Sequence, residues 1–159
     1  LHDVHLPPLH QAHALMRLHR PTPRLALGLA LRGIASAAMD VSDGLVQDLG
    51  HLLKASSGSQ PLGATLTLEK LPLSPVMQYL AGEGDALQRG VLEWALAAGD
   101  DYELLFIVPA QRQQQVEALT HELELMLTPI GEVTATAEVC LSWKSLPYSL
   151  NDVAGFRHF

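Results

Sequence analysis

The feature that most constrains the fold is a strand of small residues that runs through an acidic turn into an amphipathic helix. Residues 34–41 combine alanine with β-compatible side chains, which predicts a strand packed closely by its neighbours. Residues 44–56 then carry leucines at helical spacing. A strand followed directly by a helix with one apolar face indicates a layered fold, because each element must bury its apolar side against another.

The rest of the chain continues this alternation of helices and strands. Helical patterns cover 8–20, 25–32, 85–97 and 111–125, with a shorter helix ending near residue 80. Strand patterns cover 64–68, 102–108, 127–133 and 139–143, whereas the tail from residue 145 to 159 has no regular period. We therefore expect a layered domain of the α/β or α+β class.

Composition narrows the class of protein. A chain of 159 residues usually forms one domain, and with 48% hydrophobic but only 5% aromatic residues its core must be aliphatic. The net charge of −7 argues against nonspecific binding to nucleic acid. The single Cys140 rules out an intramolecular disulfide and fits a reducing cytoplasm. No apolar run reaches the roughly 18 residues of a membrane helix, so we expect neither a nucleic-acid nor a membrane partner.

The acidic turn at the end of the first strand is a candidate metal and phosphate site. We expect Asp40 at the carboxyl end of the strand and Asp43 at the start of the helix, where carboxylates can hold Mg²⁺ beside a phosphate. Ser42 offers a hydroxyl and backbone N–H groups at the positive end of the helix. The alternative is that Ser42 and Asp43 only cap the helix. Asp48, one turn further on, is expected to be a solvated helix residue.

A second acidic segment precedes the most apolar strand pattern. Gly99 is followed by Asp100, Asp101, Tyr102 and Glu103, and the apolar run begins directly afterwards. Carboxylates at the edge of such a strand are costly unless they are paired, so a cationic ligand or a metal-bound substrate is one interpretation. A Gly-Asp turn with solvated carboxylates is the alternative. For Glu103 we expect a partner within the protein, such as an arginine or backbone N–H groups.

Several separate motifs together resemble those of thiamine-monophosphate kinases. They are RPTPR at 20–24, DVSDGL at 40–45, DLGH at 48–51, LPLS at 71–74, GDDYEL at 99–104 and GFRHF at 155–159. Their order and spacing extend over nearly the whole chain. The chain has Asp100 where the family usually has a glutamate, which is one methylene longer.

The resemblance implies a fold, a reaction and a set of site residues. It implies that 21–159 is a C-terminal domain like that of AIR synthetase (PurM), an α+β fold with α/β/α layers in which a mixed sheet is flanked by helices. It also implies that 1–20 is a lead-in and linker helix from a missing N-terminal ATP-binding domain. The family transfers the γ-phosphoryl group of ATP to thiamine monophosphate, giving thiamine diphosphate. By resemblance, Asp40 and Asp43 would bind Mg²⁺, Ser42 would contact ATP, and Asp100 and Phe156 would contact the thiamine phosphate substrate.

The resemblance also implies a homodimeric cytoplasmic enzyme, in which this chain is inactive without the N-terminal domain. Two other functions remain open at this point. One is a non-catalytic fragment that associates with itself through a surface the missing domain would cover. The other is an ATP-dependent enzyme of the same superfamily that acts on another small molecule.

Overall fold

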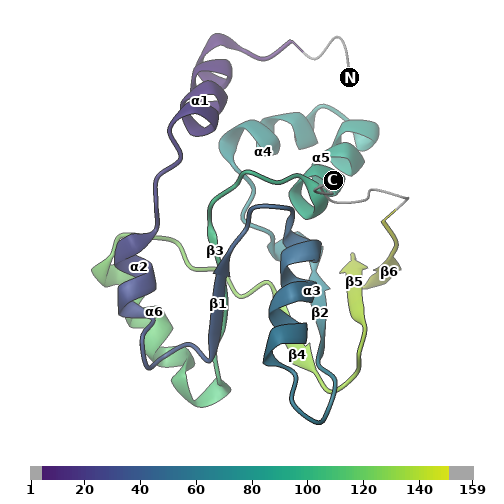
Figure 1. Cartoon of the computed structure of the whole chain (residues 1–159). Coiled ribbons are helices and arrows are strands. Elements are labelled where there is room, and N and C mark those ends of the chain that lie inside the picture. The colour runs from purple at the N-terminus through teal and green to yellow at the C-terminus, as the bar shows by residue number, and fades with distance from the viewer. Residues whose placement is uncertain (1–4, 151–159) are drawn as a thin grey trace, which may run out of the picture.

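The strands pair into two sheets (Figure 1). The structure is a computed structural model that describes residues 5–150. Strands β1 (Ala37–Asp40) and β3 (Leu104–Ile107) form an antiparallel pair. The other sheet has the order β4-β2-β5-β6, with β2 (Gly63–Thr67) antiparallel to β4 (Gly131–Thr134) and parallel to β5 (Val139–Trp143). The expected mixed sheet is therefore present, but β1 and β3 form a ribbon of their own.

Six α-helices surround these strands in the described part of the chain. They are α1 (Pro8–His19), α2 (Leu25–Ala30), α3 (Leu45–Ser56), α4 (Pro75–Gly82), α5 (Asp85–Ala97) and α6 (Gln113–Glu122). Short 3₁₀ turns lie at Leu68–Lys70 and Ala110–Arg112. Among residues 5–150, no helix has the length and apolar character needed to cross a membrane.

The β1–β3 ribbon lies between two groups of helices (Figure 1). Successive side chains of a strand point to opposite faces, so the ribbon presents apolar side chains to both groups. Leu105 belongs to the main core, which it shares with leucines of α3 and α5. Leu104 and Phe106 point to the opposite cluster, which is built on Leu27 of α2 and Leu119 of α6. With both faces covered, the ribbon is fixed in place, and so are the loops at its ends.

The main core is aliphatic, as the composition predicts. Its fully or nearly buried members come from α3, α5, the strands and the segments between them: Val41, Leu45, Leu49, Leu52, Leu53, Ala64, Leu66, Leu68, Leu71, Leu92, Leu96 and Leu105. A third cluster joins α4 to α5 through Val76, Leu80 and Val91. Helix α1 adds to that cluster, and the His10 ring stacks on Tyr79 at 4.8 Å. Helix α1 therefore packs against the domain along part of its length.

One strand lies where the sequence predicted an irregular tail. Leu146–Tyr148 forms β6, which pairs antiparallel with β5, and the Trp143 and Tyr148 rings meet edge to face at 6.0 Å. The connecting residues Lys144 and Ser145 have φ of 51° and 63°. Two left-handed residues between paired strands are typical of the tight hairpin turn that Asn-Gly usually signals. The Lys-Ser pair lacks that signal, so the sequence did not predict the hairpin. The predicted strand at 127–133 is likewise shorter, since β4 covers only Gly131–Thr134.

The positive φ angles of the hairpin turn can be tested directly at Ser145. Ser145→Gly should raise the free energy of unfolding by up to about 1 kcal/mol, because glycine adopts a positive φ without steric penalty. Ser145→Val should lower it, because a branched Cβ is disfavoured in that region. Urea denaturation of the two variants measures both effects. Equal stability of the glycine and valine variants would contradict the turn geometry.

Candidate functional site

The two acidic segments lie side by side, although about sixty positions separate them in the sequence. Backbone pairing of β1 and β3 continues past the strand ends, where Val41 N–H donates to the Glu103 carbonyl at 2.9 Å and Tyr102 N–H donates to the Val41 carbonyl at 2.9 Å. Asp100 N–H then donates to the Ser42 carbonyl, also at 2.9 Å. We call residues 40–44 the first acidic loop and residues 99–103 the second. Their backbones are joined at one end of the ribbon.

Two glycines allow this close approach. A Cβ at Gly99 would lie 2.1 Å from the Ser42 carbonyl oxygen, which leaves no room for a side chain. Gly44 has φ of 121°, and a Cβ there would lie 2.9 Å from the Ala97 carbonyl oxygen. Both glycines therefore serve the contact between the first acidic loop and the end of α5 with the segment that follows it.

The first acidic loop is organised by a residue whose surroundings differ from those expected. Asp48 is not solvated: it is 1% exposed, and its Oδ2 atom accepts hydrogen bonds from Ser42 N–H at 2.9 Å and Asp43 N–H at 3.0 Å. The helix begins at Leu45, and its N-cap residue is Gly44, which has no side chain of its own to cap it. The two N–H groups that we expected to face a phosphate are engaged by the protein's own carboxylate.

The second acidic loop has an unusual backbone. Asp100 and Tyr102 have φ of 65° and 51°, a region that residues other than glycine seldom adopt. Tyr102 O–H donates to Asp100 Oδ1 at 3.0 Å. This hydrogen bond and the charge of Asp100 raise the pKa of Tyr102, and the charges of Asp40 and Asp43 add smaller contributions. The phenol of Tyr102 therefore lies in the common field of carboxylates from both loops. Strain of this kind is often found at functional sites.

Asp101 lies in unfavourable electrostatic surroundings. Neighbouring protein atoms displace water from its carboxylate, and this desolvation raises the pKa of Asp101 above the ordinary 3.8. The negative charges of Glu103 and Asp100 raise it further. Arg17 acts in the opposite direction. The charged form of Asp101 is therefore disfavoured in the folded chain.

Glu103 has the internal arginine partner that the sequence predicted. Arg24 binds it with two hydrogen bonds, Nε to Oε2 and a terminal nitrogen to Oε1, each of 2.7 Å. Arg17 of α1 adds a third of 2.7 Å to Oε1. The bond to Glu103 raises the pKa of Arg24, although partial burial opposes it. These ion pairs fasten α1 and the segment before α2 to the second acidic loop. Because the groups remain partly exposed, the pairs serve more to orient than to stabilise.

An apolar groove adjoins the acidic loops. It has a volume of about 480 Å³, and its lining includes Pro21, Pro23, Leu25, Leu29, Asp40 and Tyr102. Its walls are thus mostly hydrocarbon, and its polar members are the Arg24 guanidinium, the Asp40 carboxylate and the Tyr102 phenol. Such a surface combines apolar walls for a flat ring with a few polar groups.

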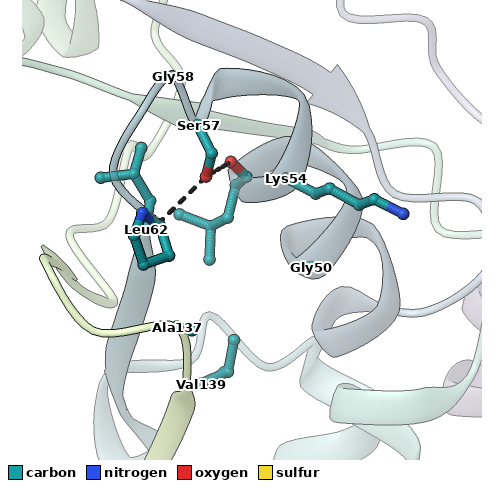
Figure 2. Close-up of a pocket in the computed structure, with 9 residues that line it drawn as sticks. Gly50, Lys54, Ser57, Gly58, Leu62, Ala137 and Val139 are labelled. Carbon is teal, nitrogen blue, oxygen red and sulfur yellow. Dashed lines mark hydrogen bonds between the residues drawn. The ribbon is translucent and has the colours of Figure 1, made fainter.

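A second hollow lies elsewhere, between the end of α3 and the start of β5 (Figure 2). It is lined by Leu53, Leu62 and Val139, with Lys54 beside them. The Ser57 hydroxyl donates to the Leu53 carbonyl and accepts the Leu62 N–H, which closes the loop above it (Figure 2). That hydroxyl is engaged in the fold, and none of the predicted site residues lines the hollow.

The carboxylates fit a hard cation only in part. Asp40 is exposed at the end of β1, and Asp43 follows in the same loop, where its Oδ2 accepts a 3.5 Å hydrogen bond from Gln47. Mg²⁺ commonly takes one or two protein carboxylates and completes its shell with water and substrate phosphate. Within residues 5–150 no group of three or more His, Cys, Asp or Glu side chains is arranged to hold a metal. A metal held by Asp40 and Asp43 would therefore take its other ligands from water, from substrate phosphate or from residues beyond those described.

The structure thus brings together four of the five predicted site residues. Asp40, Ser42 and Asp43 share the first loop, and Asp100 lies beside them in the second. Phe156 lies outside the described residues. Sequence reasoning missed Asp48, although one signal was available: a charged residue occupies the apolar stripe of α3, three positions after Leu45 and four before Leu52.

Curated relatives confirm the resemblance to thiamine-monophosphate kinases. The enzyme of that name from Salmonella typhimurium is 44% identical over 150 residues, 93% of this chain and 43% of the relative. The one from Escherichia coli K12 is 40% identical over 152 residues, 91% of this chain and 42% of the relative. No protein-family model matches the chain. The chain therefore spans less than half the length of these relatives.

Solved structures agree with the sequence comparison. The thiamine-monophosphate kinase of Stenotrophomonas maltophilia K279a has a TM-score of 0.75 and 36% identity, covering 87% of this chain and 41% of that one. A structure of AaThiL complexed with AMPPCP and TMP has a TM-score of 0.71 and 30% identity, covering 99% of this chain and 44% of that one. The fold described above is therefore that of a corresponding part of these proteins.

Close contact between the loops can be tested at Gly99. Gly99→Ala should lower the free energy of unfolding by about 1–3 kcal/mol, because the new Cβ collides with the Ser42 carbonyl and forces the loops apart. Gly90→Ala is the matched control, since no atom lies within 4 Å of a Cβ there and alanine favours its helix. Chemical denaturation compares the two. A Gly99→Ala variant as stable as the control would refute the contact.

The charge of Asp101 gives a pH-dependent test. Because its folded pKa is raised, ionisation weakens the folded state at every pH above that value and has no effect well below 3.8, where both states are protonated. Asp101→Asn should therefore raise the melting temperature near neutral pH. The gain should shrink as the pH is lowered toward 3.8. A gain that is the same at both ends of this range would contradict the electrostatic explanation.

Proposed function

We propose that this chain is part of a thiamine-monophosphate kinase, which phosphorylates thiamine monophosphate to thiamine diphosphate with ATP and Mg²⁺. The observation that carries the proposal is the pairing of the two acidic loops at one end of the β1–β3 ribbon. Homology over more than nine-tenths of the chain to proteins of that name supports it. So does the likeness to a structure containing AMPPCP, an analogue of ATP.

The proposed division of labour assigns the rest of the site to the rest of the enzyme. We place residues 21–159 in a PurM-like C-terminal domain with α/β/α layers, and residues 1–20 in the segment that joins it to an N-terminal ATP-binding domain. Apolar side chains exposed on α1 and α2 support a covering partner of this kind: Leu9, Leu15, Met16, Leu18, Leu25 and Leu29. The proposal extends to a cytoplasmic, homodimeric complete enzyme and to an isolated chain without activity.

The four predicted residues in the two acidic loops have roles that their positions support. Asp40 and Asp43 would hold Mg²⁺, which when bound neutralises phosphate charge. The Ser42 hydroxyl would contact ATP, whereas its N–H stays with Asp48. Asp100 would contact the thiamine phosphate substrate, together with Phe156. The apolar groove beside Asp40 and Tyr102 offers a surface for a ring that carries positive charge.

The reaction asks for positioning rather than for a nucleophile from the protein. An oxygen of the thiamine monophosphate phosphate forms a bond to the γ-phosphorus of ATP, and the bond from that phosphorus to ADP breaks. Little covalent chemistry is left for the protein, so alignment and charge neutralisation supply the rate enhancement. Two loops fixed to each other by backbone hydrogen bonds are suited to that task, because they keep metal-binding and substrate-binding carboxylates in register.

The proposal predicts a clear separation between turnover and folding at Asp43. In the product of the complete reading frame, Asp43→Asn should lower the rate of thiamine diphosphate formation by at least about 100-fold, since a metal ligand is lost, while the melting temperature changes little. Asp85→Asn, at the start of α5 and outside both loops, is the matched control and should keep normal turnover.

The same assay tests the division of labour. The isolated chain should form no thiamine diphosphate. Near-normal turnover by the Asp43→Asn enzyme would overturn the metal assignment. Product formation by the chain alone would overturn the role given to the remaining domain.

A further inference from the structure

Asp48 is a buried charge to which the proposed reaction has so far given no task. Among the described residues it is the one polar or charged side chain that is buried, with 1% of its surface exposed. It lies in the first turn of α3, surrounded in sequence by the core residues Leu45, Leu49 and Leu52. A leucine at this position would extend the apolar stripe. A buried carboxylate is costly unless it is well hydrogen-bonded, so its presence calls for a reason.

The hydrogen bonds of Asp48 supply that reason. A single oxygen, Oδ2, accepts both Ser42 N–H at 2.9 Å and Asp43 N–H at 3.0 Å. Hydrogen bonds to a charged acceptor are among the stronger ones in proteins. The carboxylate also lies at the positive end of α3, where negative charge is favoured. Two successive peptide groups are thereby fixed in direction, and with them the Cα–Cβ bonds of Ser42 and Asp43.

The same bonds define what the loop can offer to a phosphate. Because both N–H groups face Asp48, a ligand cannot use them and would contact Ser42 and Asp43 through other atoms. Asp100 N–H already takes the Ser42 carbonyl. The first acidic loop is thus held from within by Asp48 and from the side by the second loop. Both restraints act on Ser42, which links them.

We propose that Asp48 is a positioning residue for phosphoryl transfer. Resting on the proposed function, the inference is that Asp48 holds the Ser42–Asp43 backbone so that the Asp43 carboxylate and the Ser42 hydroxyl are preorganised for the metal and for ATP. Asp48 itself touches neither substrate. Its loss leaves the ligands present but free to move, and misplacement by about 1 Å can cost about 100-fold in rate.

Three substitutions in the complete enzyme separate positioning from packing. Asp48→Leu keeps the branched shape of the side chain and suits the apolar surroundings but removes the acceptor. Asp48→Asn keeps the shape, and one amide oxygen can still accept both N–H groups, although without the charge. Asp48→Ser replaces the leucine variant if that variant does not fold. The serine side chain is too short to accept the Ser42 and Asp43 N–H groups, and its hydroxyl can instead donate to a carbonyl one turn back in the helix. Leu53→Ala is the control for a damaged core remote from the loop.

Two measurements are made on each variant. The first is hydrogen exchange at the Ser42 and Asp43 amides without metal or nucleotide, which reports the hydrogen bonds directly. The second is thiamine diphosphate formation as a function of Mg²⁺ concentration, analysed for kcat and for the half-saturating Mg²⁺. Asp48→Leu and Asp48→Ser should lose amide protection, lower kcat by about 10- to 100-fold and raise the half-saturating Mg²⁺. Asp48→Asn should retain most of both properties. Leu53→Ala should lower the melting temperature but leave the Mg²⁺ dependence and amide protection at 42 and 43 unchanged.

The outcomes that overturn the inference differ from those that overturn the function. An active parent enzyme in which Asp48→Leu or Asp48→Ser loses amide protection but keeps kcat and Mg²⁺ dependence would reduce Asp48 to a structural residue. A structural role alone would also follow if Leu53→Ala shifted the Mg²⁺ dependence as far as the Asp48 variants do. A stable parent enzyme that forms no thiamine diphosphate would overturn the proposed function, and the inference with it.

Discussion

The continuation of β1–β3 pairing beyond the ends of the strands is the interaction on which the rest of the site depends. Three backbone hydrogen bonds of 2.9 Å carry the ladder from Val41 and Ser42 across to the segment from Asp100 to Glu103. The ribbon itself is held on both faces, by the α3–α5 core on one side and the α2–α6 cluster on the other. Burial of aliphatic side chains therefore stabilises the ribbon, and the ribbon determines the distance between the two acidic loops.

The carboxylates of these loops divide into those the fold uses and those it leaves at the surface. Asp48 accepts hydrogen bonds from two amides of the first loop, and Glu103 forms ion pairs with Arg17 and Arg24. Asp40 is exposed beside the apolar groove and Asp100 is exposed in the second loop, with Tyr102 in the field of both. Neighbouring negative charges at one edge repel each other, which contributes to the raised pKa of Asp101. A divalent cation at this edge would relieve that repulsion, which is what the proposed function requires.

Patterning and motif order predicted the main elements and four members of the candidate site, because helical and strand periods and the acidic motifs are local signals. Contacts that depend on three dimensions were less accessible. An internal partner for Glu103 was expected. The spacing of residues in the sequence could not show that this partner would be Arg17 of α1 and Arg24 of the segment before α2. Asp48 looked like a surface residue because acidic side chains usually are, and only the folded loop shows the two amides that justify its burial. Strand β6 was missed because Lys144 and Ser145 adopt left-handed backbone without the usual turn residues.

The central claim is that the two acidic loops form one functional unit, and a double-mutant cycle between Asp43 and Asp100 tests it most directly. The values of kcat/KM for thiamine monophosphate would be measured for the complete enzyme, for Asp43→Asn, for Asp100→Asn and for the double variant. Groups that act on the same transferred phosphoryl group should show coupling, so the double variant should be much less impaired than the product of the single effects predicts. Losses that multiply independently would contradict a shared site and leave the pairing of the loops as a feature of the fold alone.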